Sequence, residues 1–399
     1  MKVLEFASMI TKVSEHYDFT VFSLLATISP VVPPVPCGEE EFWSNLHGLF
    51  IGEIGIGKSS LLMKIAKVAP KYDILDKTTE GSLAGIYDPA RKDIAFPVIE
   101  SAQNGVIIST EFDKVMANKR LQGHIRRILE KYPIKAWSRG RTRVIIPNVS
   151  LLASANPKED VFTTARIADS LVFQLGVVNR FDFIKIAKQS KEHIRKLAEL
   201  IVKNIGKNGY ETTYSRIKHY ITNTYRFWYG NSNYRIVLKN KHIGELTKIF
   251  LENSNPENNP LHNIRVLISA IKIMNVSVAF HYKDRKSRGK RFTSESEDLE
   301  LTEMFLKAQL DNLTKLYSYI SKDILKENRW AKILKVYSII RKLSVSKGKP
   351  VKLAEVIRES EKEKIASENT IRKYVEILER EGYIKRKLEN TVYYVYLLK

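Results

Sequence analysis

The stretch Gly52-Glu53-Ile54-Gly55-Ile56-Gly57-Lys58-Ser59 decides the fold of this chain. It matches the pattern G-x-x-x-x-G-K-[ST], and it stands between the apolar run Leu49-Phe50-Ile51 and a helical pattern over residues 61–68. In such a strand–loop–helix unit, glycines allow successive backbone N–H groups to surround phosphate oxygens at the positive end of the helix. The stretch therefore predicts a phosphate-binding loop (P-loop) for a nucleoside triphosphate, with ATP and Mg²⁺ as the expected ligands.

The residues of this loop have separate expected tasks. Lys58 reaches the β- and γ-phosphates, and the Ser59 hydroxyl is a ligand of Mg²⁺. The loop residues that we expect to surround ATP are Gly52, Glu53, Ile54, Gly55, Ile56, Gly57, Lys58, Ser59 and Ser60.

Further apolar runs predict two more buried strands, Val106-Ile107-Ile108 and Val149-Ser150-Leu151-Leu152-Ala153. Strands that alternate with helical patterns indicate an α/β fold, in which helices cover both faces of a parallel sheet. Composition and periodicity then divide the chain into an N-terminal helical segment (1–40), the α/β core (41–187), a helical linker and lid (188–325) and a small separate domain (330–399). In the last part, three helical patterns precede two strand-like runs joined at Glu389-Asn390, which is the order of a winged helix.

The second strand ends at Thr110-Glu111, where a P-loop protein presents acids to the metal and to the attacking water. We expect Glu111 to orient or activate that water. The expected metal-side residues are Ser59, Thr110 and Glu111, although Thr110 stands where an Asp is usual. A neutral hydroxyl can hold a metal-bound water but supplies no negative charge. In the alternative interpretation, Glu111 and Asp113 are ordinary solvated carboxylates.

The composition points to a polyanionic partner. The 399-residue chain has 66 Lys and Arg against 44 Asp and Glu, a formal charge of +22, which favours nucleic acid first and an anionic membrane second. Its single cysteine, Cys37, excludes an internal disulfide and a Cys-based zinc cluster. Because prolines interrupt the apolar residues 20–36, no run reaches the roughly 18 residues of a membrane span. We expect a cytoplasmic, nucleoid-associated protein.

Four motifs occur in a fixed order around the P-loop. They are Glu111-Phe112-Asp113-Lys114, Ala153-Ser154-Ala155-Asn156-Pro157, Asn179-Arg180-Phe181-Asp182, and Arg265-Val266-Leu267 with Ile271-Lys272. With them the chain resembles the AAA+ motor of the minichromosome maintenance (MCM) replicative helicases, followed by their C-terminal winged helix. The resemblance covers residues 40 to 325, weakly from 190 to 255.

The resemblance implies an AAA+ P-loop ATPase with a helical lid, which drives translocation on DNA during replication. It implies that Asn156 positions the lytic water as sensor 1, and that Arg180 (arginine finger) and Arg265 (sensor 2) act on a neighbouring subunit's ATP. A homo-oligomeric ring, most often a hexamer, is therefore expected. The family's large N-terminal domain has no room in the first 40 residues, so we expect this chain to lack it.

Two basic turns are candidate DNA contacts. In Trp137-Ser138-Arg139-Gly140-Arg141-Thr142-Arg143, a hairpin turn presents Arg139 and Arg141, at the place of the family's pre-sensor hairpin. In Asp88-Pro89-Ala90-Arg91-Lys92-Asp93, Arg91 and Lys92 fall at the family's helix-2 insert. Basic side chains at these tips would bind phosphates, unless both are simply solvated turns.

The C-terminal domain offers a second basic surface. Arg372 and Lys373 lie on the outer face of its third helix, and Lys385, Arg386 and Lys387 lie on its wing. These residues would contact a DNA groove and its phosphates, although winged helices also bind proteins.

Two other functions remain open at this point. One is a nucleotide-switched, DNA-binding initiator or loader with slow or no hydrolysis, which the neutral Thr110 favours. The other is an inactive relative that modulates an active ring. The arginine-tipped hairpin favours the motor.

Overall fold

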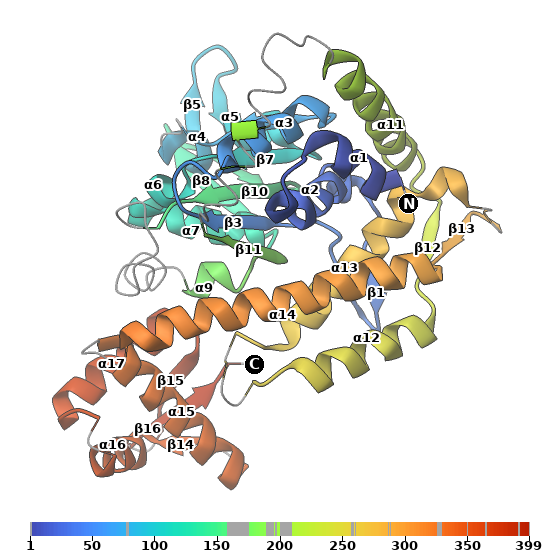
Figure 1. The fold of residues 1–399 in the computed structure, drawn as a ribbon. Helices are drawn as coiled ribbons and strands as arrows, with labels where there is room; N and C mark the ends of the chain where they lie inside the picture. The colour runs from blue at the N-terminus through green and yellow to red at the C-terminus, as the bar shows by residue number, and fades with distance from the viewer. Residues whose placement is uncertain are drawn as a thin grey trace. The chain divides into compact units, whose positions relative to one another are not determined.

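A computed structural model describes most of the chain and divides it into two compact units. The described residues are 2–76, 80–157, 175–188, 195, 198–199, 210–256, 259, 261–285, 287, 289–324, 329–348, 350–363, 365–389 and 392–398. One unit comprises residues 1–162 and 177–316, and the other comprises residues 163–176 and 317–399. Figure 1 shows their helices and strands.

The first unit is built on a parallel sheet of five strands. These are β3 (Gly48–Gly52), β4 (Tyr72–Ile74), β7 (Val106–Ser109), β10 (Ser150–Ala155) and β11 (Phe183–Ala187), in the spatial order β11-β3-β10-β7-β4. Each neighbouring pair is parallel. All residues of β3 and β7 are buried, as expected for a parallel sheet covered on both faces. The three predicted strands and the α/β class are confirmed, and two further strands complete the sheet.

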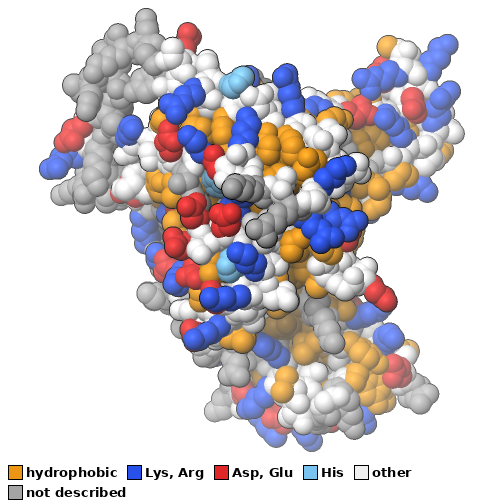
Figure 2. All heavy atoms as spheres, turned by 90° about the vertical axis from the view of Figure 1, so that its right-hand side faces the viewer, with side chains coloured by type: hydrophobic (Ala, Val, Ile, Leu, Met, Phe, Trp, Pro, Cys, Tyr) orange, Lys and Arg blue, Asp and Glu red, His pale blue; other side chains and the backbone are white. Residues whose placement is uncertain are grey.

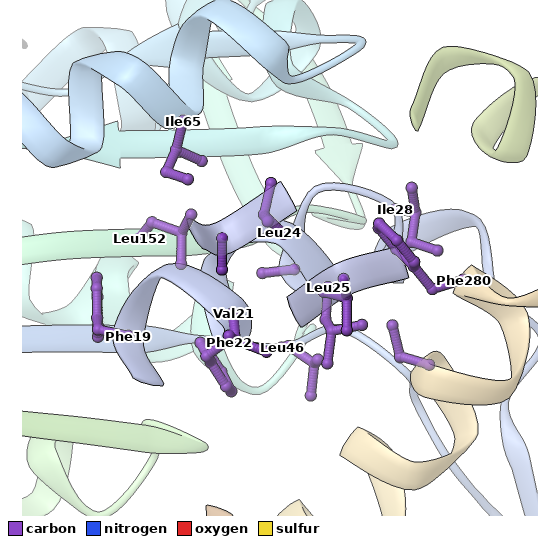
Figure 3. Packing of buried hydrophobic residues seen from close by; sticks show 14 of the residues in the cluster. Phe19, Val21, Phe22, Leu24, Leu25, Ile28, Leu46, Ile65, Leu152 and Phe280 are labelled. Carbon is purple, nitrogen blue, oxygen red and sulfur yellow. The ribbon is translucent and has the colours of Figure 1, made fainter. Parts of the chain in front are cut away.

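The N-terminal helices pack into the core of this unit. They are α1 (Lys2–Ile10) and α2 (Ser14–Ala26), with the P-loop helix α3 (Lys58–Val68) beside them. Phe19 and Phe22 of α2 are fully buried, and their rings lie 5.0 Å from Phe50 and 5.3 Å from Phe183. Figure 3 shows Phe19 and Phe22 of α2 beside the sheet, and Phe280 of α13 (Ile264–Phe280) near Ile28. A helix that is buried on most sides belongs to the centre of the unit.

Short helices and hairpins connect the strands. The helices are α4 (Glu80–Ala84), α5 (Pro97–Ala102), α6 (Phe112–Ala117), α7 (Lys119–Leu129) and α9 (Leu175–Val178), with the 3-10 turn η1 (Ser29–Val31). The antiparallel hairpins are β1–β2 (Val35–Cys37, Glu40–Phe42), β5–β6 (Ile86–Asp88, Asp93–Ala95) and β8–β9 (Ile134–Ser138, Arg141–Ile145). No helix among the described residues is long and apolar enough to cross a membrane.

The rest of this unit is helical with one short parallel strand pair. It contains α11 (Tyr210–Gly230), α12 (Asn240–Asn253), α13, the turn η3 (Tyr282–Asp284) and most of α14 (Ser296–Ile324). Within the predicted helical linker and lid (188–325), the structure adds a short strand that the sequence did not predict, β12 (Arg235–Val237), which pairs with β13 (Arg291–Thr293). That pairing joins distant segments, and local periodicity does not encode it. Most of residues 190–209 lie outside the described residues.

A buried carboxylate fastens α13 to the sheet. Asp182 accepts hydrogen bonds from the His47 backbone N–H (2.8 Å), the Ser269 hydroxyl (2.8 Å) and Lys272 Nζ (2.6 Å). Ser269 and Lys272 lie on α13, so this one side chain fixes the helix that carries Arg265 relative to the core.

The second unit has its own core. It contains α15 (Arg329–Lys347), β14 (Val351–Lys352), α16 (Leu353–Lys362), α17 (Glu368–Arg380), β15 (Ile384–Glu389) and β16 (Val392–Leu397). The strands form an antiparallel sheet in the order β14-β16-β15. Val336, Ile371 and Val395 are fully buried in its apolar cluster. The predicted order of three helices and a hairpin is confirmed, while Asn390, at the predicted turn, lies outside the described residues.

Candidate nucleotide-binding site

The P-loop has the backbone conformation that its glycines permit. It runs between β3 and α3, and Gly55 and Gly57 both have φ of 84°, in the left-handed region that favours glycine. At Gly52, an added Cβ would lie 2.2 Å from Ile56 Cδ1, so a side chain there has no space. The loop leads directly into the N-terminus of α3, where backbone N–H groups and the helix dipole favour a phosphate.

Lys58 lies inside this loop. Its side chain is buried, and its ammonium donates hydrogen bonds to the backbone carbonyls of Gly52 (2.6 Å) and Glu53 (2.8 Å). The hollow above it is lined by Ile54, Gly55, Gly57, Lys58, Ser59, Ser60 and Asn156. The structure thus brings the predicted P-loop residues and the predicted sensor Asn156 to one site. Asn156 reaches it because β10 lies beside β3, and its backbone N–H donates to Asp113 Oδ1 (3.1 Å).

Glu111 lies just after the carboxyl end of β7 and is the N-cap residue of α6. It is half exposed, and its Oε1 lies 2.5 Å from Lys114 Nζ. This hydrogen bond and the charge of Glu111 raise the pKa of Lys114. An exposed ion pair of this kind is weak, so the Glu111 carboxylate is free to turn.

Thr110, beside Glu111, is hydrogen bonded to a carboxylate that the sequence analysis did not select. The Thr110 hydroxyl donates to Asp76 Oδ2 at 2.5 Å. Asp76 follows β4, and it meets Thr110 because β4 pairs with β7 in the sheet. Nothing in the local sequence around Asp76 distinguishes it from any other acid after a strand.

The oxygen donors at this end of the sheet suit Mg²⁺. This ion prefers one or two carboxylates together with phosphate oxygens and waters, rather than a cage made only of protein side chains. Ser59, Thr110, Asp76 and Glu111 supply hydroxyl and carboxylate oxygens. Within the described ranges, no cluster of three or more His, Cys, Asp or Glu could hold a metal ion by itself. A magnesium ion bound with the nucleotide therefore fits these residues.

The two predicted trans-acting arginines lie together, away from the hollow at Lys58. Arg180 Nε lies 2.7 Å and Arg265 Nη2 lies 3.3 Å from the same atom, Oε1 of Glu130, at the end of α7. Burial lowers the pKa of Arg180, and the charge of Glu130 opposes that effect. Neither arginine is among the described residues that line the hollow.

The predicted basic hairpin is a hairpin in the structure. Arg139 and Gly140 form its two-residue turn with φ of 50° and 73°, the sign that a type I′ turn requires. The Arg139 guanidinium lies 4.6 Å from the Tyr87 ring of β5, so the two hairpins are in contact. Arg141 is exposed. Trp137, which the sequence analysis left without a role, has 73% of its surface exposed near this tip.

The neighbouring β5–β6 hairpin holds its arginine in ion pairs. Arg91 lies 3.3 Å from Asp88 and 2.7 Å from Glu100, while Lys92 is exposed with φ of 52°. Glu100 also pairs with Arg143 of β9 at 2.6 Å, which fastens the two hairpins to each other.

The basic residues of the second unit differ in their surroundings. Arg372 pairs with Glu368 on α17 at 2.6 Å, and Lys373 is exposed. Arg386 is bound within the unit, 2.7 Å from Glu379 and 3.6 Å from Glu376. The exposed wing cations are Lys385 and Lys387, and Lys387 Nζ lies 5.3 Å from the Tyr396 ring. On the face that Figure 2 shows, Lys and Arg side chains are spread among acidic ones and form no single patch.

Comparison with known proteins identifies the family of this chain. The chain matches the family model of the MCM P-loop domain over residues 6–205. It is 30% identical over 158 residues to DNA replication licensing factor mcm5 of Dictyostelium discoideum, covering 38% of this chain and 20% of that protein. It is 25% identical over 206 residues to the minichromosome maintenance protein MCM of Saccharolobus solfataricus, covering 49% of this chain and 29% of that protein.

A third relative is the probable DNA helicase MCM8 of Oryza sativa subsp. indica, which is 28% identical over 149 residues, 36% of this chain and 18% of that protein. The chain thus matches less than a third of the length of each of these relatives. The family match itself covers half of the chain, and it includes the P-loop, Glu111, Asn156 and Arg180. This chain therefore belongs to the MCM family of P-loop proteins.

Proposed function

We propose that this protein is an ATP-dependent DNA translocase or helicase of the AAA+ type that acts in DNA replication. The observation that carries the proposal is the hollow lined by Lys58, Ser59 and Asn156, with Glu111 at the end of the neighbouring strand β7. It contains a phosphate-binding cation, a metal-side hydroxyl and an amide that can orient water. The relatives named as a replication licensing factor and as a probable DNA helicase support the replication role.

The proposed hydrolysis assigns one task to each of these side chains. Lys58 exchanges its bonds to the Gly52 and Glu53 carbonyls for phosphate oxygens, and Asn156 orients the attacking water. Glu111 accepts the proton of that water once its pair with Lys114 has opened. Bound Mg²⁺ would neutralise phosphate charge on the Ser59 side.

A homo-oligomeric ring, a hexamer by family resemblance, is the proposed assembly. Arg180 and Arg265 are held at Glu130 rather than beside Lys58, which supports their action on the nucleotide of a neighbouring subunit. Such an arginine stabilises the charge that develops on the transferred phosphoryl group.

We assign DNA binding to two sets of residues. The hairpin tips carry Arg139, Arg141, Arg91 and Lys92, with Trp137 beside them as a surface on which a base can stack. The C-terminal unit has the element order of a winged helix. Its proposed DNA contacts are Arg372, Lys373, Lys385, Arg386 and Lys387, and Arg386 also joins β15 to α17.

Residues 1–40 and 41–187 form the nucleotide-binding part in this proposal, residues 188–325 the lid and residues 330–399 the winged helix. A location on the nucleoid follows from this DNA binding.

A second candidate is a nucleotide-switched DNA-binding initiator or loader. The neutral hydroxyl of Thr110 favours it, because slow hydrolysis suits a switch better than a motor.

The test is ATP hydrolysis measured with and without single-stranded DNA, beside strand displacement and mass photometry of the same sample. The motor requires DNA-stimulated turnover, strand displacement and a ring. Nucleotide-dependent DNA binding with no displacement identifies the switch. Failure to bind ATP rejects both.

A further inference from the structure

Asp76 is the most heavily hydrogen-bonded acid near the proposed nucleotide site. Its Oδ1 accepts from the Ser109 hydroxyl (2.9 Å) and from the backbone N–H groups of Thr110 (2.7 Å) and Glu111 (3.1 Å). Its Oδ2 accepts from the Thr110 hydroxyl at 2.5 Å. All four donors belong to Ser109, the last residue of β7, and to Thr110 and Glu111, which follow it. The Asp76 carboxylate is therefore bound to position 110, where a P-loop protein of this type usually has an Asp.

The short Thr110–Asp76 bond fixes the direction of the Thr110 hydroxyl. A carboxylate only accepts hydrogen bonds, so the hydroxyl hydrogen must point toward Asp76. The lone pairs of the Thr110 oxygen then point away from Asp76 and remain available to accept from another donor. A bond of this length to an ionised group is charge-assisted, so it increases the electron density on the Thr110 oxygen.

We propose that Asp76, acting through the Thr110 hydroxyl, supplies the negative charge that the metal side of the nucleotide site lacks because position 110 is Thr. Two residues that follow adjacent strands thus take the place of one acid. Thr110 would face the waters of a magnesium–nucleotide complex, and Asp76, bound to the Thr110 hydroxyl, would provide the negative charge. Asp76 is a positioning residue in this scheme. The inference rests on the proposed function, because it concerns the same ATP site.

A purely structural role is the competing explanation. The same four hydrogen bonds hold the segment after β4 against the end of β7, and this would stabilise the edge of the sheet without affecting the metal. The two roles differ in one measurable property. A structural tie affects stability and nucleotide affinity whether or not Mg²⁺ is present, whereas a charge on the metal side affects only the gain in affinity that Mg²⁺ provides.

The experiment measures the affinity of the full chain for a fluorescent, non-hydrolysable ATP analogue in Mg²⁺ and in EDTA. The ratio of the two affinities is the Mg²⁺ enhancement. We expect Asp76→Asn to lower this enhancement about fivefold or more, with little change in EDTA. Thr110→Val should do the same, and it leaves Asp76 its bonds to Ser109 and to two backbone N–H groups, so the fold is retained. The matched control is Asp73→Asn, because Asp73 lies on β4 and accepts from its neighbour Ile74 (2.7 Å).

Rescue separates charge from structure. The double variant Asp76→Asn with Thr110→Asp moves the carboxylate from the end of the edge strand β4 to the end of its neighbour β7. The new amide at position 76 can then donate a hydrogen bond to this carboxylate. We expect this variant to recover the Mg²⁺ enhancement of the wild type. An enhancement that survives both Asp76→Asn and Thr110→Val overturns the inference, and so does a loss that Thr110→Asp does not restore. If the wild type itself does not bind the analogue, the proposed function fails instead.

Discussion

Arg180 and Arg265 meet at a single oxygen atom, Oε1 of Glu130, at distances of 2.7 Å and 3.3 Å. Arg126 is a further cation nearby, and its charge helps to lower the pKa of Arg180. An excess of positive charge at a partly buried position is suited to an anion, such as the terminal phosphate of a nucleotide on another subunit. Glu130 therefore holds the two arginines together.

The first prediction concerns these arginines. Arg180→Ala is expected to reduce ATP turnover about 10³-fold, because an arginine finger stabilises charge that develops only in the transition state. Nucleotide affinity of the isolated subunit should be unchanged. Arg216→Ala is the matched control, since Arg216 pairs with Glu5 on the surface. Mixing Arg180→Ala with Lys58→Ala subunits should restore part of the turnover, and no restoration at any ratio contradicts action between subunits.

The second prediction separates binding from hydrolysis at the hollow. Lys58→Ala should abolish ATP binding, because Lys58 is the buried cation of the P-loop. Glu111→Gln should retain ATP binding and lower turnover by about 10²- to 10⁴-fold, which is the usual contribution of a general base. Binding is measured by calorimetry and turnover by phosphate release. Turnover that survives Glu111→Gln assigns the base elsewhere, and the exposed Glu41 provides the control Glu41→Gln.

The third prediction uses salt to distinguish two kinds of DNA contact at the hairpin. Replacing Arg139 and Arg141 by Ala should weaken DNA binding and reduce the slope of log affinity against log salt by about two, because each phosphate contact contributes about one. Trp137→Ala should weaken single-strand binding by about 1–3 kcal/mol and leave the slope unchanged, since stacking releases no counterions. Trp43→Ala, at another exposed tryptophan, is the control. Unchanged affinity in both variants removes the hairpin from the DNA path.

The fourth prediction separates stability from DNA binding in the C-terminal unit. Arg386→Ala should lower the stability of this unit by about 1 kcal/mol, because Arg386 ties β15 to Glu379 and Glu376 of α17. Lys385→Ala and Lys387→Ala should leave the melting temperature unchanged while weakening DNA binding. Calorimetry and fluorescence anisotropy report the two properties. If the lysine variants bind DNA as the wild type does, these two lysines are not DNA contacts.

The fifth prediction concerns pH. Burial lowers the pKa of His47 from 6.5 to about 3, and its Nδ1 accepts a hydrogen bond from the Leu151 backbone N–H (3.0 Å). The unfolded chain therefore binds a proton below pH 6.5 that the folded chain does not. Above pH 6.5 this proton does not affect the free energy of unfolding. As the pH decreases from 6.5 to 3, the free energy of unfolding falls by about 1.4 kcal/mol for each pH unit. Urea unfolding at pH 7 and pH 5 measures this loss, and His47→Asn should make the loss smaller. An equal pH dependence in both proteins excludes His47 as its cause.

The sequence by itself determined the features that depend on neighbouring residues. The P-loop, its strand β3 and its helix α3 lie within one short segment, so their spacing predicts both the fold class and the site. The turn at Arg139 and Gly140 and the helix–helix–helix–hairpin order of the C-terminal unit are also local, and both were predicted. The order of the family motifs along the chain then predicted roles for Asn156, Arg180 and Arg265.

Only the tertiary structure decided which distant residues meet. Asp76 lies 34 residues before Thr110, and the two come together because β4 is placed beside β7 in the sheet. Glu130 meets Arg265 across 135 residues, and Arg139 meets Tyr87 because two hairpins pack together. Local sequence patterns predict backbone conformation and burial. The strand order and the packing of helices determine which residue each charged side chain contacts. For that reason Thr110 is a lone neutral residue in the sequence, while in the folded protein its hydroxyl is bound to the carboxylate of Asp76.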